Sequence, residues 1–282
     1  MNREMIPIVS YPKSGNTYLR FLLANIVKKS NKEITFDNIN YFTSTTPFIS
    51  DINYKRIEKN INDNSPILIK EHQFYGNHKD FKFNKVIYLY RDITNVINSY
   101  YHFTNAQKPG LFKSPKDFVM NYWNYCGYWG AHVESWLGGD KISTDTTILA
   151  VSYENLVSNT KEELLRITNF LNLSVTEEKI EKAIYDSSKD KLRSMKSDTF
   201  MNSKTNNFHF VRHKNVFENI INDSLKKNVL SESLTRKWLS ELYNYNELNT
   251  HESISKKIKY YPSMFRKYKM NLRYRLYHLF NE

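Results

Sequence analysis

Cysteine is almost absent from this sequence, because Cys126 is the only one among 282 residues. A single cysteine excludes an intramolecular disulfide and is typical of proteins from a reducing compartment, so we expect a cytoplasmic location. Histidine, cysteine and carboxylate residues also do not cluster at the spacings that metal ligands need. The sequence therefore predicts no metal site.

Long apolar runs are missing as well. No stretch approaches the roughly 18 apolar residues of a membrane-spanning helix. The first apolar run is interrupted by Pro7, Ser10, Lys13 and Arg20, so we expect no signal peptide. Glycine and proline number seven each, which leaves little room for long flexible linkers. The length is enough for one large α/β domain or two small ones, with a substantial core.

Acidic residues are scarce at one end of the chain. Residues 255–282 contain eight Lys or Arg side chains and one Glu, and carry +7 of the formal net charge of +12. We therefore divide the chain into a domain over 1–254 and a basic amphipathic segment over 255–282. We expect this segment to pack on its own domain; the alternative is contact with an anionic membrane surface. The mildly basic body suits an anionic ligand and requires no nucleic acid.

The most informative stretch lies near the start of the chain. Residues 6–9 form a short apolar run that predicts a buried strand, and from residue 18 apolar residues recur at helical spacing. The turn between them, 12–17, reads Pro-Lys-Ser-Gly-Asn-Thr. Backbone N–H groups at a helix start bind anions, Gly15 lets the backbone approach an oxyanion, and Lys13 adds a full charge. We expect an anion-binding turn here.

This turn departs from the ATP-binding pattern G-x-x-x-x-G-K-[ST]. When Gly15 and Thr17 are aligned with the last Gly and the Ser/Thr, Ser10 replaces the first Gly and Asn16 replaces the lysine. The positive charge lies three residues upstream, at Lys13. The pattern therefore argues against an ATP-type loop with Mg²⁺, and a P-loop kinase is kept as an alternative.

Three further apolar runs predict strands, at 66–72, 85–91 and 146–152. Helical periodicity predicts helices over 93–103, 114–137, 157–171, 176–196, 217–228 and 231–246, with loops and short helices over 31–62. Strands that alternate with helices predict an α/β domain. In such a domain, functional groups gather where parallel strands end.

Four segments, taken in order, resemble the cytosolic-type sulfotransferases that use 3′-phosphoadenosine 5′-phosphosulfate (PAPS). The sequence Tyr-Pro-Lys-Ser-Gly-Asn-Thr-Tyr at 11–18 closely resembles their 5′-phosphosulfate loop. Lys70-Glu-His72 resembles their Lys-x-His segment, Arg91 with a serine eight positions later resembles their 3′-phosphate site, and 153–155 resembles their Tyr-Glu-Asp. The resemblance implies a three-layer α/β sandwich with a central, mostly parallel sheet and a P-loop-like turn after the first strand.

The resemblance also implies roles for the matching residues. His72 would be the general base, a task that suits an imidazole because its usual pKa lies near working pH. Lys13 would stabilise charge on the bridging oxygen as 3′,5′-adenosine bisphosphate (PAP) leaves, and Lys70 would steady the sulfonyl group. The implied donor-binding residues are Lys13, Ser14, Gly15, Asn16, Thr17, Tyr18, Arg91, Ser99, Tyr153, Arg212, His213 and Lys214.

Within this donor site, the resemblance divides the contacts by chemistry. Tyr18 and Tyr153 are candidates for contact with the adenine. Arg91 and Ser99 are candidates for the 3′-phosphate, which an arginine fork grips with two parallel hydrogen bonds. The serines at 187–188 lie about where the family has a further nucleotide contact.

The segment over 197–216 departs from the family pattern. Arg212 is kept, but His213 and Lys214 stand where the family commonly has Lys and Gly, and the following Gly-Asp-Trp is absent. We expect a lid that differs from that of the family.

The acceptor has no signature in the sequence. We expect a small molecule, such as a secondary metabolite, that is modified on a hydroxyl or on an amine or amide nitrogen. A saccharide or a lipid headgroup is the alternative acceptor, and a nucleotide-binding protein without catalysis is the non-enzymatic alternative. We expect a monomer or a homodimer.

Overall fold

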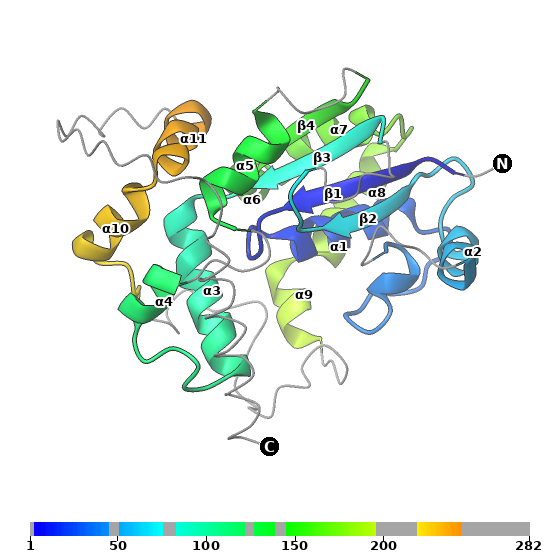
Figure 1. The fold of residues 1–282 in the computed structure, drawn as a ribbon. Coiled ribbons are helices and arrows are strands. Elements are labelled where there is room, and N and C mark those ends of the chain that lie inside the picture. The colour runs from blue at the N-terminus through cyan, green and yellow to red at the C-terminus, as the bar shows by residue number, and fades with distance from the viewer. Residues whose placement is uncertain are drawn as a thin grey trace.

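The computed structural model describes residues 3–44, 51–75, 83–121, 127–138, 145–195 and 219–243. Its central sheet has the strand order β2-β1-β3-β4, and all described pairings are parallel (Figure 1). The strands are β1 (Met5–Ser10), β2 (Ile67–Glu71), β3 (Lys85–Tyr90) and β4 (Thr147–Ser152). The four predicted strands are therefore confirmed.

Helices cover both faces of this sheet (Figure 1). One face shares an apolar core with α1 (Asn16–Val27), α7 (Thr160–Phe170) and α8 (Glu177–Asp186). The other face shares a second core with α3 (Ile93–Gln107), α4 (Pro115–Asn121), α5 (Trp129–Leu137), α10 (Asp223–Leu230) and α11 (Ser233–Tyr243). Because both faces are covered, the strands are apolar along nearly their whole length. The predicted three-layer α/β sandwich is confirmed.

The remaining described elements are short. They are the 3-10 turn η1 (Ile39–Tyr41) and the helices α2 (Asp51–Asn60), α6 (Tyr153–Ser158) and α9 (Lys189–Ser194). In the part of the chain that the structure describes, no helix is both long enough and apolar enough to cross a bilayer. The boundary at residue 254 and the segment 255–282 lie outside the described residues and stay predictions.

Two helices predicted as continuous are each interrupted. The region predicted as 157–171 contains the end of α6 and then α7, separated at Asn159, whose φ of −127° and ψ of 52° are not helical. The region predicted as 176–196 contains α8 and α9, with 187–188 between them. Helical periodicity continues across both breaks, which is why the sequence did not reveal them.

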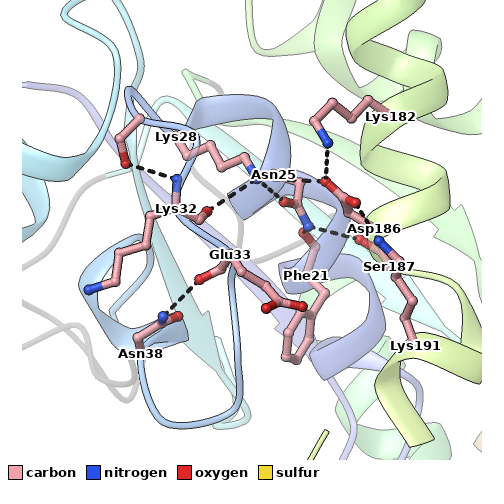
Figure 2. Close-up of polar contacts among 11 residues, drawn as sticks. Phe21, Asn25, Lys28, Lys32, Glu33, Asn38, Lys182, Asp186, Ser187 and Lys191 are labelled. Atoms are coloured by element: carbon pink, nitrogen blue, oxygen red, sulfur yellow. Dashed lines mark hydrogen bonds and ion pairs between the residues drawn. The ribbon is translucent and has the colours of Figure 1, made fainter. Parts of the chain in front are cut away.

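Polar contacts fasten α1 to α8 (Figure 2). Asn25 Nδ2 donates to Ser187 Oγ at 3.2 Å, and Lys28 Nζ donates to Asn25 Oδ1 at 2.7 Å. Lys28 Nζ also lies 3.7 Å from a carboxylate oxygen of Asp186 at the end of α8. These contacts hold the C-terminal end of α1 against the end of α8.

Candidate functional site

The turn between β1 and α1 has an unusual backbone. Lys13 has a φ of 71° and Gly15 a φ of 101°, both in the left-handed region. For a residue with a side chain, this conformation costs about 1–2 kcal/mol, and such strain concentrates at functional sites. The turn leads directly into α1, whose first N–H groups lack intrahelical acceptors. The predicted succession of strand, turn and helix is therefore present, and the binding of an anion by this turn stays a prediction.

Asn16 holds this turn through its side chain. Its Nδ2 donates to the Ile8 carbonyl at 2.9 Å and to Ser10 Oγ at 3.1 Å. Asn16 is 5% exposed, so its amide spans the strand end and the helix start beneath the turn. A contribution of Asn16 to donor binding would therefore come through its backbone N–H.

Three segments that are distant in sequence meet at the turn. The ring of Tyr153 lies so close to Gly15 that a Cβ added there would stand 2.2 Å from Tyr153 Cδ2. The Arg91 guanidinium lies 4.4 Å from the centre of the same ring, and its Nη1 donates to the Lys13 carbonyl at 3.2 Å. Residues that follow β1, β3 and β4 are thus brought together, as parallel strands with one common edge require.

Three buried polar atoms in this group, the acceptor Asn16 Oδ1 and two hydrogen-bond donors, have no partner in the described chain. Ser14 Oγ and Arg91 Nε are both buried and make no hydrogen bond to the described chain. Buried donors are normally satisfied, so Ser14 Oγ and Arg91 Nε are each available to an acceptor atom of water or of a bound ligand. Phosphate and sulfate oxygens accept hydrogen bonds from hydroxyl and guanidinium groups. The site therefore fits an anionic ligand such as the sulfonyl donor.

The side chain of Lys13 points to α3. Its Nζ lies 3.8 Å above the ring of Phe103, a cation–π contact. Ser99 lies four residues before Phe103 in the same helix and therefore shares this face. The structure thus places Ser99 on the side of α3 that faces the turn, two helical turns beyond Arg91.

The two candidate base-stacking residues lie near one another. Burial raises the pKa of Tyr18, a hydrogen bond with Thr160 opposes this shift, and the neighbouring Tyr153 adds to it. Thr17 lies beside them in the first turn of α1 and is partly buried. Tyr18 and the turn therefore both lie near Tyr153.

His72 directly follows β2 and packs against the end of β1. Its Nδ1 lies 2.6 Å from the Ser10 carbonyl and 3.3 Å from Ser10 Oγ. A carbonyl oxygen only accepts, so Nδ1 carries the hydrogen and Nε2 carries the lone pair. Burial, and then the charge of Lys70, lower the pKa of His72 to about 3. The imidazole is therefore neutral at physiological pH, in the tautomer that a base acting through Nε2 needs.

The backbone around His72 is held by groups that sequence reasoning did not identify. Glu71 Oε1 accepts hydrogen bonds from the N–H groups of His72 and Gln73, at 2.7 and 2.6 Å. From α5, His132 Nε2 donates to the His72 carbonyl at 3.1 Å and Trp136 Nε1 to the Gln73 carbonyl at 2.9 Å. His132 and Trp136 are four residues apart and therefore lie on one face of α5. In the sequence, a histidine on an otherwise apolar helix face was the one signal that pointed to this support.

His132 is in turn fixed by a partner in the sheet. Tyr88 OH lies 2.8 Å from His132 Nδ1. Because Nε2 donates to the His72 carbonyl, Nδ1 accepts and the tyrosine donates. Burial lowers the pKa of His132 to about 3. A neutral, buried chain therefore connects β3 through α5 to the backbone of His72.

We expect the two histidines to make the fold sensitive to acid. In the unfolded chain each binds a proton below its usual pKa of about 6.5, whereas in the folded chain both stay neutral down to about 3. The free energy of unfolding is therefore unaffected by the two histidines above pH 6.5. As pH falls below this value, it decreases by up to about 1.4 kcal/mol per pH unit for each histidine.

Urea unfolding between pH 7.5 and 5 would measure this loss. His132→Gln keeps an amide donor and acceptor, removes one titrating group, and should roughly halve the slope. A free energy of unfolding that stays constant from pH 6.5 to 5 would contradict the expectation.

Lys70 lies on the same side of the sheet as α1. It pairs in register with Ile8 of β1, which packs in the core shared with α1. Burial, and then the charge of Arg20, lower the pKa of Lys70 to about 8, and Glu71 opposes this shift. Lys70 lies two residues before His72, and its charge helps to lower the pKa of the imidazole. That the two side chains point the same way stays a prediction from their spacing.

Some of the predicted residues lie outside the described ranges, and one predicted contact is wrong. Arg212, His213 and Lys214 lie outside the described residues, as does Cys126, so their roles stay predictions. The prediction that Ser187 contacts the nucleotide is wrong, because Ser187 is fully buried and its hydroxyl accepts a hydrogen bond from Asn25. Asn25 lies ten residues beyond Gly15, about 15 Å along α1. Among the described residues, no group of histidine, cysteine and carboxylate side chains could hold a metal ion.

Comparisons with known proteins identify the family of this chain. The sulfotransferase domain family matches residues 3–252. Sulfotransferase 1E1 of Cavia porcellus is 29% identical over 213 residues, which cover 68% of this chain and 67% of that protein. Amine sulfotransferase of Oryctolagus cuniculus is 24% identical over 208 residues, which cover 71% of this chain and 66% of that protein.

Solved structures show the same fold. Mouse sulfotransferase SULT7A1 complexed with PAP superimposes with a TM-score of 0.54 at 20% identity, covering 84% of this chain and 88% of that one. Retinol dehydratase in a complex with retinol and PAP gives a TM-score of 0.58 at 16% identity, covering 86% and 82%. With the family match extending over most of its length, the chain belongs to the sulfotransferase family.

Proposed function

We propose that this protein transfers a sulfonyl group from PAPS to a hydroxyl or an amine or amide nitrogen of a small molecule and releases PAP. PAPS is the donor used by the sulfotransferase family. One observation supports the proposal most strongly. Two buried hydrogen-bond donors without a partner lie where four residues come together, namely Lys13, Gly15, Arg91 and Tyr153. His72 follows the neighbouring strand and is bonded to the end of β1.

The turn would hold the 5′-phosphosulfate. Its backbone N–H groups and Ser14 Oγ supply preorganised donors, and Lys13 supplies the charge that stabilises the leaving phosphate. Arg91 and Ser99 would hold the 3′-phosphate. Both groups lie beside the turn, Arg91 through its bond to Lys13 and Ser99 through the face that it shares with Phe103.

His72 would act as the base in an in-line displacement. A bond forms between the acceptor oxygen or nitrogen and sulfur, the bond between sulfur and the bridging oxygen breaks, and its electron pair leaves with PAP. The acceptor proton passes to Nε2 of His72. Negative charge bound beside Lys13 would raise the pKa of His72 from about 3 towards the range in which a base is most effective.

Lys70 would steady the sulfonyl group during transfer. It lies two residues before His72, and its charge acts on the imidazole. Positioning and charge stabilisation of this kind account for most of the catalysis in the related phosphoryl transfers.

The acceptor is proposed by class only. A secondary metabolite of small size is the first candidate, and a saccharide or lipid headgroup is the second. One relative bears the name amine sulfotransferase, which supports keeping nitrogen among the possible acceptor atoms. A cytoplasmic location and a monomeric or homodimeric state belong to the same proposal.

Comparison of PAP with ATP tests the donor class. At a PAP concentration 100 times its Kd, binding stabilises a protein by about 2.7 kcal/mol, which raises the Tm of a chain this size by about 5–10 °C. We expect this shift with PAP and a much smaller one with ATP and Mg²⁺. A larger shift with ATP and Mg²⁺ would instead support a P-loop kinase.

A further inference from the structure

Arg20 is a buried cation that has no place in the donor site described above. It belongs to α1 and is 1% exposed. Its Nε and Nη2 donate to Thr43 Oγ1 at 2.9 and 2.7 Å, and Nη2 also donates to Asn40 Oδ1 at 2.8 Å. Across the described ranges, no carboxylate forms an ion pair with it. A buried charge without an opposite charge is costly, so its retention calls for an explanation.

The partners of Arg20 lead directly to Lys70. Thr43 is fully buried, and the next residue, Ser44, extends the sheet beside β2. The N–H of Ser44 donates to the Leu68 carbonyl at 2.8 Å, and the N–H of Lys70 donates to the Ser44 carbonyl at 2.9 Å. Arg20 therefore fastens the short segment that holds the backbone of Lys70.

The two side chains also lie on the same side of the sheet. Lys70 points to the face covered by α1, because its register partner Ile8 packs in the core shared with that helix. Arg20 belongs to α1 itself. The charged or titratable groups around Lys70 are Arg20 on α1 and Glu71 and His72 at the end of β2, and His132 on α5 holds the His72 backbone.

We propose that Arg20 is a positioning residue for Lys70: it fastens the segment 40–44 to α1, and it places a buried positive charge on the side of the sheet to which the Lys70 amine points. The role rests on the proposed function, in which Lys70 steadies the sulfonyl group. An ordinary lysine stays fully charged between pH 7 and 9, whereas this one loses its charge within that interval. Transfer should therefore slow as pH rises through about 8.

Chemical labelling measures this charge without donor or acceptor. Competitive reaction of the full chain with acetic anhydride between pH 6 and 11, read by mass spectrometry, gives the midpoint at which each lysine becomes reactive. We expect the Lys70 midpoint near pH 8 in the wild type. Arg20→Met should move it upward, and a rise of one pH unit lowers the neutral fraction at pH 8 about fivefold.

Two matched variants separate charge from packing. Arg20→Lys keeps a positive charge at position 20. Thr43→Val removes the hydroxyl that accepts from Arg20 but leaves the Arg20 charge in place. In both variants the labelling midpoint of Lys70 should therefore stay near pH 8. Thr43→Val should still lower the Tm, because it leaves guanidinium donors unsatisfied. The high-pH limb of kcat should move with the labelling midpoint in Arg20→Met and stay in place in Thr43→Val.

An unchanged Lys70 midpoint in Arg20→Met would overturn the proposal, as would a midpoint in Thr43→Val that rises as much as in Arg20→Met. Arg20→Gln replaces Arg20→Met if that variant does not fold, with the same expectation. Absence of PAP binding would refute the proposed function and leave the labelling midpoints unaffected, so the two failures are distinguishable.

Discussion

Replacing His72 with alanine is expected to lower kcat by about two to four orders of magnitude, the usual contribution of a general base. The affinity for PAP should stay within a few-fold of the wild type, because the imidazole bonds to the end of β1 while the donor-binding groups lie in the turn and beside Arg91. Steady-state kinetics and calorimetric titration with PAP measure the two effects separately.

His72→Asn is the matched variant for this experiment. Its Nδ2 can donate to the Ser10 carbonyl in place of the imidazole Nδ1–H, but it offers no basic nitrogen. We expect the same loss of kcat as in the alanine variant, with a smaller loss of stability. Near wild-type turnover in either variant would show that His72 is not the base.

The pH profile gives a second view of the same residue. Because the pKa of His72 is lowered to about 3, the base form is present throughout the neutral range. The kcat/KM of the free enzyme should therefore show no acidic limb at the usual histidine pKa of about 6.5. Such a limb, abolished in His72→Asn, would mean that burial does not govern the charge of this imidazole.

Replacing Gly15 with alanine is expected to abolish measurable PAP binding and to destabilise the fold by about 1–3 kcal/mol. The new Cβ would stand 2.2 Å from Tyr153 Cδ2, and φ at this position is 101°. The ring must therefore move, and Arg91 rests on that ring. Displacing it disturbs both predicted phosphate sites together. Titration with PAP and the Tm measure the two losses.

Gly110→Ala is the matched control. Gly110 also has a positive φ, of 81°, but nothing lies within 4 Å of a Cβ added there. The backbone strain is therefore similar and the collision is absent, so we expect a loss of about 1 kcal/mol with PAP binding intact. Wild-type affinity for PAP in Gly15→Ala would contradict the position proposed for the donor.

Much of the donor site was open to prediction because its signals are local. A strand, a turn and a helix start within residues 5–27 are set by short apolar runs, one glycine and helical periodicity. Asp92 is a similar case: it directly precedes the helix predicted over 93–103, and its carboxylate accepts from the N–H groups of Thr94 and Asn95. Interactions over a few residues depend on sequence alone, so pattern reasoning reached them.

The side chains that hold the backbone of His72 could not be predicted from such local patterns. His132 and Trp136 lie 60 and 63 residues from their acceptors, and Arg20 lies 23 residues from Thr43. Nothing in a periodic pattern states which buried polar group will meet which carbonyl. That choice follows from strand order and from the way in which α5 packs on the sheet.

The sequence by itself determined the elements, their order and the chemistry available at the strand ends, because backbone preference and apolar periodicity act over a few residues. Only the tertiary structure decided which charges are buried together and therefore how they titrate. Burial and neighbouring charge lower the pKa values of His72 and Lys70, and both causes exist only once distant segments have packed against one another.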